Sequence, residues 1–260
     1  MKPGIPTRRP VSAVIITFNE ETAIEVCLRA LSWCDEIVVV DSGSCDSTVA
    51  MATAGGAKVL SQAWLGYGKQ KDFAVSQATN DWVLCVDADE IVSPELRASI
   101  EAILRAPTFG AYEMPRCNRF MGRYLRHGEG YPDWNLRLFD RRRARWSEDP
   151  VHENVLTDEK VGRLHGDLLH ESAETLHSYL EKQNRYTTLQ AEALYRKGVR
   201  PSVVKLILSP LVRFLKFYFI RLGFLDGVPG LVHIAIGCFN TFAKNAKLFG
   251  LWAGKADPGR

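Results

Sequence analysis

The chain has 260 residues, of which 46% are hydrophobic and 24% are charged, a composition typical of a globular protein with ample material for a core. Its six cysteines are scattered without a C-x-x-C pair, which favours reduced thiols over a disulfide framework. The net charge of +3 hides an asymmetry, because residues 191–260 carry 11 Lys and Arg against 3 Asp and Glu, and the preceding residues carry 22 against 27. Since the body is acidic and contains no known nucleic-acid module, we expect no nucleic-acid partner.

Two classes of membrane segment are not expected. The N-terminal stretch MKPGIPTRRP has charges and prolines where a signal peptide would have its apolar region, so it is interpreted as a basic leader before a strand. Apolar runs of 18 residues, the length needed to span a bilayer, do not occur. We therefore expect a cytoplasmic protein.

Apolar runs alternate with segments of helical periodicity along the first part of the chain. Because the runs are continuously apolar, we expect strands buried on both faces, and this alternation is typical of a parallel sheet with crossover helices. The predicted strands cover residues 11–18, 36–42, 57–62 and 81–90. The predicted helices cover residues 20–34, 47–56, 68–79 and 94–105.

The second part of the chain is less regular. Residues 110–170 contain short strands, many aromatic residues and many arginines, a pattern typical of a region that shapes a substrate pocket. A long helix is predicted over residues 171–198, closed by Gly198. Two apolar and aromatic segments with interspersed Lys and Arg follow, at residues 203–224 and 230–252.

Three of the predicted strands end in polar sequences, TFNEE, DSGSCDST and DADE. Ligands of open parallel sheets bind at the carboxyl ends of the strands, so we expect these sequences to form one crevice. The chain has neither G-x-G-x-x-G nor G-x-x-x-x-G-K-[ST], which argues against a dinucleotide oxidoreductase and a P-loop NTPase. Asp87 and Asp89 are spaced to bracket Mg²⁺ or Mn²⁺, and such a cation can neutralise a diphosphate leaving group.

The sequences VIITFNEE, VVVDSGSCDST, KQKDFAVSQATNDWVLCVDADE and a downstream VHE together resemble family 2 glycosyltransferases of the GT-A fold. More narrowly, the chain resembles the bacterial lipopolysaccharide-core β-1,4-glucosyltransferase group. The resemblance implies a three-layer α/β/α fold with a mostly parallel central sheet. Residues 1–190 would form the GT-A glycosyltransferase domain, and residues 191–260 would form a C-terminal helical, membrane-associating region.

The resemblance also implies which residues bind the nucleotide-sugar. Thr17, Asn19 and Glu20 would line the nucleotide pocket after the first strand. Asp41 would accept a hydrogen bond from the uracil or ribose of a UDP-sugar, although a carboxylate in the sequence DSGS also suits a turn cap. Lys69 would lie near the base or the diphosphate, with a solvated helix start as the alternative.

The metal site implied by the resemblance uses three residues. Asp89 would be the direct ligand of a divalent cation, Mg²⁺ or Mn²⁺, and Asp87 would lie beside the ribose and the metal. His170 would complete the metal shell, because a neutral imidazole is a suitable third ligand. A core or capping role is the alternative for this histidine.

An inverting transfer needs a base that deprotonates the acceptor hydroxyl. The sequence VHE resembles the acceptor-side acid of the family, and this favours Glu153. Glu148, Asp149 and Asp133 are the other candidates, and Glu153 could instead be a surface carboxylate paired with an arginine.

Two basic features indicate anionic partners. Arginines at 116, 119, 123, 126, 137, 141, 142, 143 and 145 could recognise a phosphorylated acceptor or anionic lipid, or could pair with local acids. The C-terminal apolar segments suit helices in the interface of an anionic membrane, although they could also pack on the catalytic domain. Both interpretations stay open at this point.

The function predicted from the sequence is transfer of a hexose, glucose from UDP-glucose, to a lipid-linked saccharide such as the lipopolysaccharide inner core, with inversion. The enzyme would act as a peripheral protein on the inner face of the cytoplasmic membrane. The alternatives are a nucleotidyltransferase of related fold, whose glycine-rich loop is missing, and a non-catalytic membrane-associated scaffold, which would not explain three acidic strand ends.

Overall fold

The computed structural model describes residues 8–148, 153–171 and 175–256. The chain forms two compact units. One contains residues 1–117 and 133–171, and the other contains residues 118–132 and 172–260.

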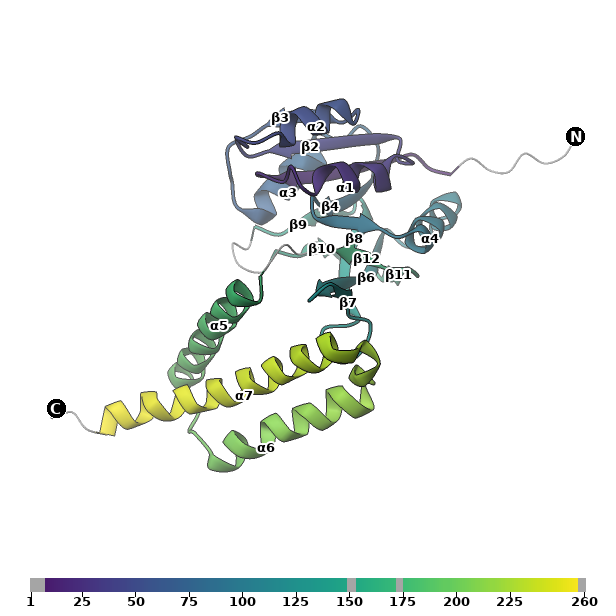
Figure 1. The fold of residues 1–260 in the computed structure, drawn as a ribbon. Helices are drawn as coiled ribbons and strands as arrows, with labels where there is room; N and C mark the ends of the chain where they lie inside the picture. The colour runs from purple at the N-terminus through teal and green to yellow at the C-terminus, as the bar shows by residue number, and fades with distance from the viewer. Residues whose placement is uncertain (1–7, 149–152, 172–174, 257–260) are drawn as a thin grey trace, which may run out of the picture. The chain divides into compact units, whose positions relative to one another are not determined.

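The first unit is built on a sheet whose first half is parallel (Figure 1). Neighbouring strands follow the order β3-β2-β1-β4, and the three crossover connections carry helices. The strands are β1 (Val11–Thr17), β2 (Glu36–Asp41), β3 (Lys58–Ser61) and β4 (Trp82–Asp87). The helices are α1 (Ile24–Leu31), α2 (Thr48–Ala54) and α3 (Tyr67–Ser76). The alternation predicted from the sequence is therefore confirmed over this half.

The second half of the sheet is mainly antiparallel and continues from β4 in the order β8-β6-β12-β5, with β11 beside β6. These strands are β5 (Glu90–Val92), β6 (Ala111–Phe120), β8 (Asp133–Asp140), β11 (Val161–Arg163) and β12 (Leu168–His170). A separate ribbon pairs β9 (Ala144–Trp146) with β10 (Val155–Thr157). The antiparallel pairing of β5 with β12 sets His170 opposite Glu90.

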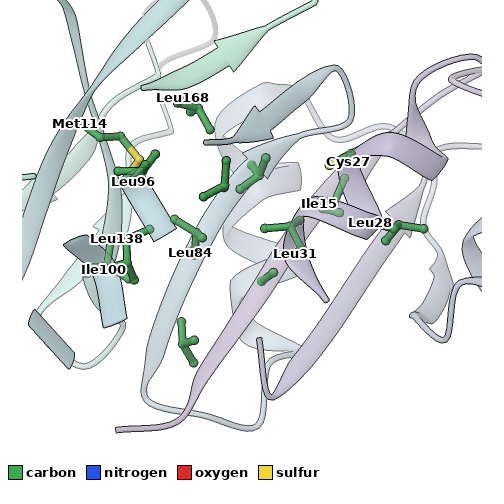
Figure 2. Close-up of a cluster of buried hydrophobic side chains, with 14 of the residues drawn as sticks. Ile15, Cys27, Leu28, Leu31, Leu84, Leu96, Ile100, Met114, Leu138 and Leu168 are labelled. Carbon is green, nitrogen blue, oxygen red and sulfur yellow. The ribbon is translucent and has the colours of Figure 1, made fainter. Parts of the chain in front are cut away.

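Helices cover both faces of this sheet. Helices α1, α2 and α4 (Pro94–Arg105) bury their apolar residues against one face, and Figure 2 shows part of this cluster around Ile15, Leu84 and Leu138. Helix α3 and the ribbon strand β9 cover the other face. Ser93 caps α4 by accepting a hydrogen bond from the Leu96 amide, and Pro94 follows as expected. The predicted three-layer α/β/α fold is confirmed.

Residues 81–90 do not form the single strand that the sequence predicts. The strand β4 ends at Asp87, and Glu90 begins the separate strand β5. The cause is the side chain of Glu90, which is fully buried, accepts a hydrogen bond from the Asp87 amide and contacts Arg137. Because Glu90 turns inward, the chain bends at Ala88 and Asp89.

The second unit is helical apart from the short strand β7 (Arg123–Tyr124), which pairs with the end of β6. Its long helices are α5 (Leu176–Arg196), α6 (Val203–Phe214) and α7 (Gly227–Ala256), and α7 packs against both others (Figure 1). Between α6 and α7 lie a π-helical segment, η1 (Leu215–Ile220), and a 3-10 turn, η2 (Gly223–Asp226). None of the helices within the described ranges has both the length and the apolar character needed to cross a membrane.

The units divide the chain differently from the predicted boundary at residue 190, which falls inside α5. Residues 118–132 belong with the C-terminal helices because polar contacts hold them there. The His127 amide donates to Asp226, the Gly128 amide donates to the Arg221 carbonyl, and Glu129 forms an ion pair with Arg213. These contacts join residues about a hundred positions apart, which local sequence patterns do not reveal.

Leu84 lies fully buried in β4, between the helices and the sheet. We expect Leu84→Ala to lower the free energy of unfolding by about 2–5 kcal/mol, because it removes apolar contacts and leaves a cavity. Urea denaturation followed by circular dichroism measures this change. Val49→Ala on α2, where Val49 is 38% exposed, is the control and should change stability by less than about 0.5 kcal/mol.

Candidate active site

A cavity of about 730 Å³ opens at the carboxyl ends of β1, β2 and β4 in the first unit. Its polar lining comes from all three strand ends that the sequence singled out and from the end of β12. The polar and acidic lining residues are Thr17, Glu20, Ser42, Asp87, Asp89 and His170. The predicted convergence of distant segments into one crevice is therefore present.

Asp89 and His170 face each other in this cavity. His170 Nε2 lies 3.0 Å from Asp89 Oδ2, and the Glu171 amide donates to the Asp89 carbonyl at 2.8 Å. The pairing of β5 with β12 produces this contact, because His170 and Glu90 are cross-strand partners and Asp89 directly precedes Glu90. Burial lowers the pKa of His170, but the hydrogen bond and charge of Asp89 outweigh burial and raise the pKa above its usual value.

Asp87 is surrounded by two buried cations. Its carboxylate lies 2.8 Å from Arg137 Nη2 and 3.2 Å from Lys71 Nζ. Burial alone would raise the pKa of Asp87, but the charges of Arg137 and Lys71 hold it well below its usual range. Arg137 also contacts Glu90 at 3.2 Å, and both cations lie over the Trp146 ring.

Sequence reasoning missed the roles of Lys71 and Arg137. Both are more than nine-tenths buried, which is rare for charged residues without partners. A signal was available for Lys71, since it shares the helical face of Ala74 and Val75, which pack on the sheet. Arg137 likewise interrupts the apolar strand sequence WNLRLF.

Glu20 lies close to other carboxylates. Burial is the largest cause of its raised pKa, and the nearby carboxylates of Asp89, Asp46 and Asp87 raise the pKa further. Thr17, on the same wall of the cavity, has a buried hydroxyl oxygen without a hydrogen-bond partner in the described part of the chain. A polar ligand that brings positive charge would relieve both the crowded carboxylates and the unpaired hydroxyl.

Asp41 and Asn19 organise the turns beside the cavity. Asp41 accepts hydrogen bonds from the Gly43 and Ser44 amides, each at 2.9 Å, and from the Ser44 hydroxyl at 2.5 Å. Asn19 adopts a left-handed conformation with φ of 55°, and its side-chain oxygen accepts from the Cys45 amide at 2.9 Å. Asp41 thus has the turn-capping role that the sequence allowed, and it holds the neighbouring Ser42 at the cavity wall.

Glu153 lies beside the site and is connected to it through Lys71. The ammonium group of Lys71 is 3.6 Å from Glu153 Oε1 and 3.2 Å from Asp87 Oδ1, so it contacts both carboxylates. Gly68 permits this arrangement, since a Cβ there would lie 2.0 Å from the Ser147 carbonyl oxygen. Glu153 is not among the residues that line the cavity.

The other candidate bases have separate partners. Glu148 pairs with Lys69 at 3.6 Å, and both side chains are exposed. Asp133 pairs with Arg116 at 3.0 Å. Asp149 lies outside the described residues.

Several arginines of the irregular region pair with local acids, as one of the two interpretations proposed. Arg142 contacts Asp81 and Asp140, Arg143 contacts Glu159, and Arg116 contacts Asp133. Together with Arg137, which pairs with Asp87 and Glu90, at least four of the nine arginines have local acids as partners.

The donor set for a cation is limited. In the described residues, no group of three or more His, Cys, Asp or Glu side chains is arranged to hold a metal ion. Asp89 and His170 are adjacent, but Asp87 is engaged by Arg137 and Lys71. Mg²⁺ in proteins is often held by one or two carboxylates together with substrate phosphates and water, so Asp89, with His170 beside it, is compatible with a site that the nucleotide completes.

Comparison with known proteins identifies the family. The model of glycosyl transferase family 2 matches residues 12–157, which include β1 to β4 and the cavity. The chain is 33% identical over 257 residues to the lipopolysaccharide core biosynthesis glycosyltransferase LpsC of Rhizobium meliloti, covering 96% of this chain and 95% of that protein. The chain belongs to glycosyl transferase family 2. The family predicted from the sequence motifs is therefore confirmed.

Two further proteins are similar to this chain over most of their length. An uncharacterized glycosyltransferase of Rickettsia typhi is 33% identical over 253 residues, covering 92% of this chain and 87% of that protein. Among solved structures, glucosyl-3-phosphoglycerate synthase of Mycobacterium tuberculosis, crystallised with Mn²⁺, UDP and glucosyl-3-phosphoglycerate, superposes with a TM-score of 0.46. It is 19% identical and covers 75% of this chain and 82% of that chain.

Arg137 connects the fully buried carboxylate of Glu90 with the partly exposed carboxylate of Asp87. We expect Arg137→Met to lower the free energy of unfolding by about 3–5 kcal/mol, because it leaves buried negative charge without a partner. Chemical denaturation measures the change. Arg143→Met removes an exposed ion pair with Glu159 and should cost less than about 1 kcal/mol. Equal effects of the two substitutions would contradict a structural role for the buried cluster.

Proposed function

We propose that this member of glycosyl transferase family 2 is a metal-dependent, inverting enzyme that transfers a hexose from a UDP-sugar to a lipid-linked saccharide. Glucose from UDP-glucose is the proposed donor, and the lipopolysaccharide inner core is the proposed acceptor. The observation that carries the proposal is the acidic cavity in which Asp89 and His170 meet beside Glu20. The similarity to a lipopolysaccharide core glycosyltransferase over nearly its whole length supports the acceptor class.

The proposed cation is Mg²⁺ or Mn²⁺, held by Asp89 and His170. When bound, it would neutralise charge on the diphosphate leaving group. The carboxylate of Asp89 is the type of donor that these cations prefer, and a neutral imidazole such as that of His170 is a common metal ligand. The raised pKa of Glu20 reflects burial and excess negative charge at this wall. Asp87 is proposed to act beside the ribose and the metal, oriented by Arg137 and Lys71.

The nucleotide is proposed to lie against the ends of β1 and β2. Thr17, Asn19 and Glu20 would line this part, and the unpaired hydroxyl of Thr17 is available to a ligand. Asp41 would act at the uracil or ribose directly or through the turn that it stabilises. Lys69 is proposed to act near the base or diphosphate, since its long, exposed side chain forms a surface ion pair with Glu148, which is a weak interaction.

Glu153 is the proposed base. In an inverting transfer, the base takes the proton of the acceptor hydroxyl while that oxygen attacks the anomeric carbon and UDP leaves from the opposite face. Lys71, between Asp87 and Glu153, ties this carboxylate to the wall of the donor cavity. This contact favours Glu153 over Glu148, which pairs with the exposed Lys69.

We further propose that the enzyme works on the inner face of the cytoplasmic membrane as a peripheral protein, where it meets its lipid-linked acceptor. The basic C-terminal region supports this placement. Nucleic acid is not a proposed partner. Membership of glycosyl transferase family 2 disfavours the nucleotidyltransferase and scaffold alternatives.

Release of UDP from UDP-glucose tests the reaction and its metal dependence. We expect turnover that requires Mg²⁺ or Mn²⁺ and is stimulated by a lipid-linked acceptor, and we expect Asp89→Asn to reduce it by at least about 100-fold, since metal-ion catalysis contributes several kcal/mol. Asp158→Asn, in an exposed turn, is the control. Absence of turnover with every UDP-sugar, together with absence of metal-dependent UDP binding, would refute the proposed function.

Carboxylate-to-amide substitutions identify the base. We expect Glu153→Gln to lower kcat by about 10²–10⁴-fold, because general base catalysis contributes this factor, while UDP binding stays near that of the unsubstituted protein. Glu148→Gln and Asp133→Asn are matched substitutions of the rival candidates and should retain most activity. If the Glu148→Gln or the Asp133→Asn protein lost most of its kcat while the Glu153→Gln protein stayed active, the substituted residue would be the base in place of Glu153.

A further inference from the structure

Helix α6 and the following turn carry an apolar stripe that the second unit leaves exposed. Val204, Ile207, Leu208 and Leu211 of α6, and Leu215 at the start of η1, occupy positions i, i+3, i+4, i+7 and i+11, so they share one side of the helix. Ile207 is 62% exposed and Leu211 is 54% exposed. A stripe of this kind on a soluble helix normally faces the core, so its exposure calls for a partner.

The opposite side of α6 already has its partner within the unit. Helices α6 and α7 pack side by side (Figure 1), and Arg213 reaches from α6 to Glu129 and to the Thr241 hydroxyl on α7, the latter at 2.9 Å. Packing against α7 therefore fixes the rotation of α6 about its axis. The exposed stripe is the side that α7 does not cover.

A groove of about 480 Å³ runs beside this stripe, between α6, η1 and α7. Its apolar lining includes Leu208 and Val212 of the exposed side, and its polar lining includes Lys205, Ser209 and Lys216. The described residues provide no ion pair for Lys205 or Lys216, and Lys216 lies 5.3 Å from the Phe217 ring centroid. The groove thus combines two unneutralised ammonium groups, a hydroxyl and an apolar floor.

Apart from Glu129, which pairs with the groove residue Arg213, the charge of the chain that forms the groove is almost all positive. Residues 203–256 contain seven lysines and arginines and a single acid, Asp226. That acid is buried, accepts from the His127 amide at 2.8 Å and lies 3.0 Å from the His127 ring. Its charge therefore does not reach the exposed surface to offset the lysines.

We propose that this face of α6 and the groove beside it form a docking site for a bilayer that contains anionic lipid. The apolar stripe enters the boundary between headgroups and acyl chains, and Lys205 and Lys216 bind the lipid phosphates in the groove. The chemistry favours lipid over a second copy of the chain, because pairing two such faces would bring four uncompensated lysines together. The inference deepens the proposed membrane association, and its test measures vesicle binding independently of sugar transfer.

Flotation with vesicles of phosphatidylcholine alone, or of phosphatidylcholine mixed with phosphatidylglycerol, tests the site. We expect the protein to float with the mixed vesicles only, and added salt to weaken binding. The double substitution K205Q/K216Q should reduce the partition coefficient at least about tenfold, since each basic residue near an anionic surface contributes about fivefold. R196Q/K197Q removes the same charge from the exposed end of α5 and should reduce it less than threefold.

A second pair of substitutions tests the stripe. I207S/L211S should also weaken vesicle binding at least about tenfold, while circular dichroism stays unchanged because both side chains are exposed. If the K205Q/K216Q and R196Q/K197Q proteins bound vesicles equally, the proposal that the groove binds lipid phosphates would be wrong. If the I207S/L211S protein bound vesicles as well as the unsubstituted protein, the proposal that the apolar stripe enters the bilayer would be wrong.

Two further measurements separate this inference from the others. Light scattering measures whether the protein forms a dimer. A stable dimer of the unsubstituted protein that the I207S/L211S protein does not form would show that this face binds a second copy of the chain, and the proposed lipid site would be wrong. Release of UDP from UDP-glucose in solution should be the same in all these variants, so a failed vesicle test with normal turnover would refute the docking site alone.

Discussion

The ion cluster in which buried Glu90, Lys71 and Arg137 hold Asp87 at the cavity wall is the constraint on which the candidate site depends. Charges taken out of water are costly, and they are tolerated here because each carboxylate faces a cation at short distance. Arg137 reaches the cluster from β8 and Lys71 from α3, so the cluster ties together the sheet and the helix that covers it. It also directs Glu90 inward, which ends β4 and creates the bend that presents Asp89.

This arrangement gives the two aspartates of the D-x-D sequence different surroundings. Asp87 is neutralised by buried cations, so its pKa is held low and its orientation is fixed despite the cost of burial. Asp89 faces the cavity and the imidazole of His170. Two acids of nearly equal exposure that both line the cavity thus differ in their partners, because Asp87 is paired with two buried cations and Asp89 with an imidazole.

The helical unit contains no comparable ion cluster among its described residues and is held together differently. Its interior is held by apolar packing of α7 against α5 and α6 and by polar contacts from residues 118–132, including those to Asp226 and Arg213. Because Asp226 and Glu129 are engaged in these contacts, they do not neutralise Lys205 and Lys216 beside the exposed apolar side of α6. The proposed use of this surface at a membrane follows from that distribution of charge.

The sequence by itself determined the parallel half of the sheet, the α/β class and the convergence of three polar strand ends. Continuous apolar runs and caps such as Ser93 are local signals, so they report local structure directly. It also indicated Asp89, Glu153 and His170 as candidates through the family resemblance. Tertiary structure alone decided that Lys71 and Arg137 surround Asp87, that β5 pairs with β12 to join Asp89 to His170, and that residues 118–132 belong with the C-terminal helices. Each of these depends on contacts between residues far apart in the chain, whose partners are selected by packing and charge compensation and leave no periodic signal in the sequence.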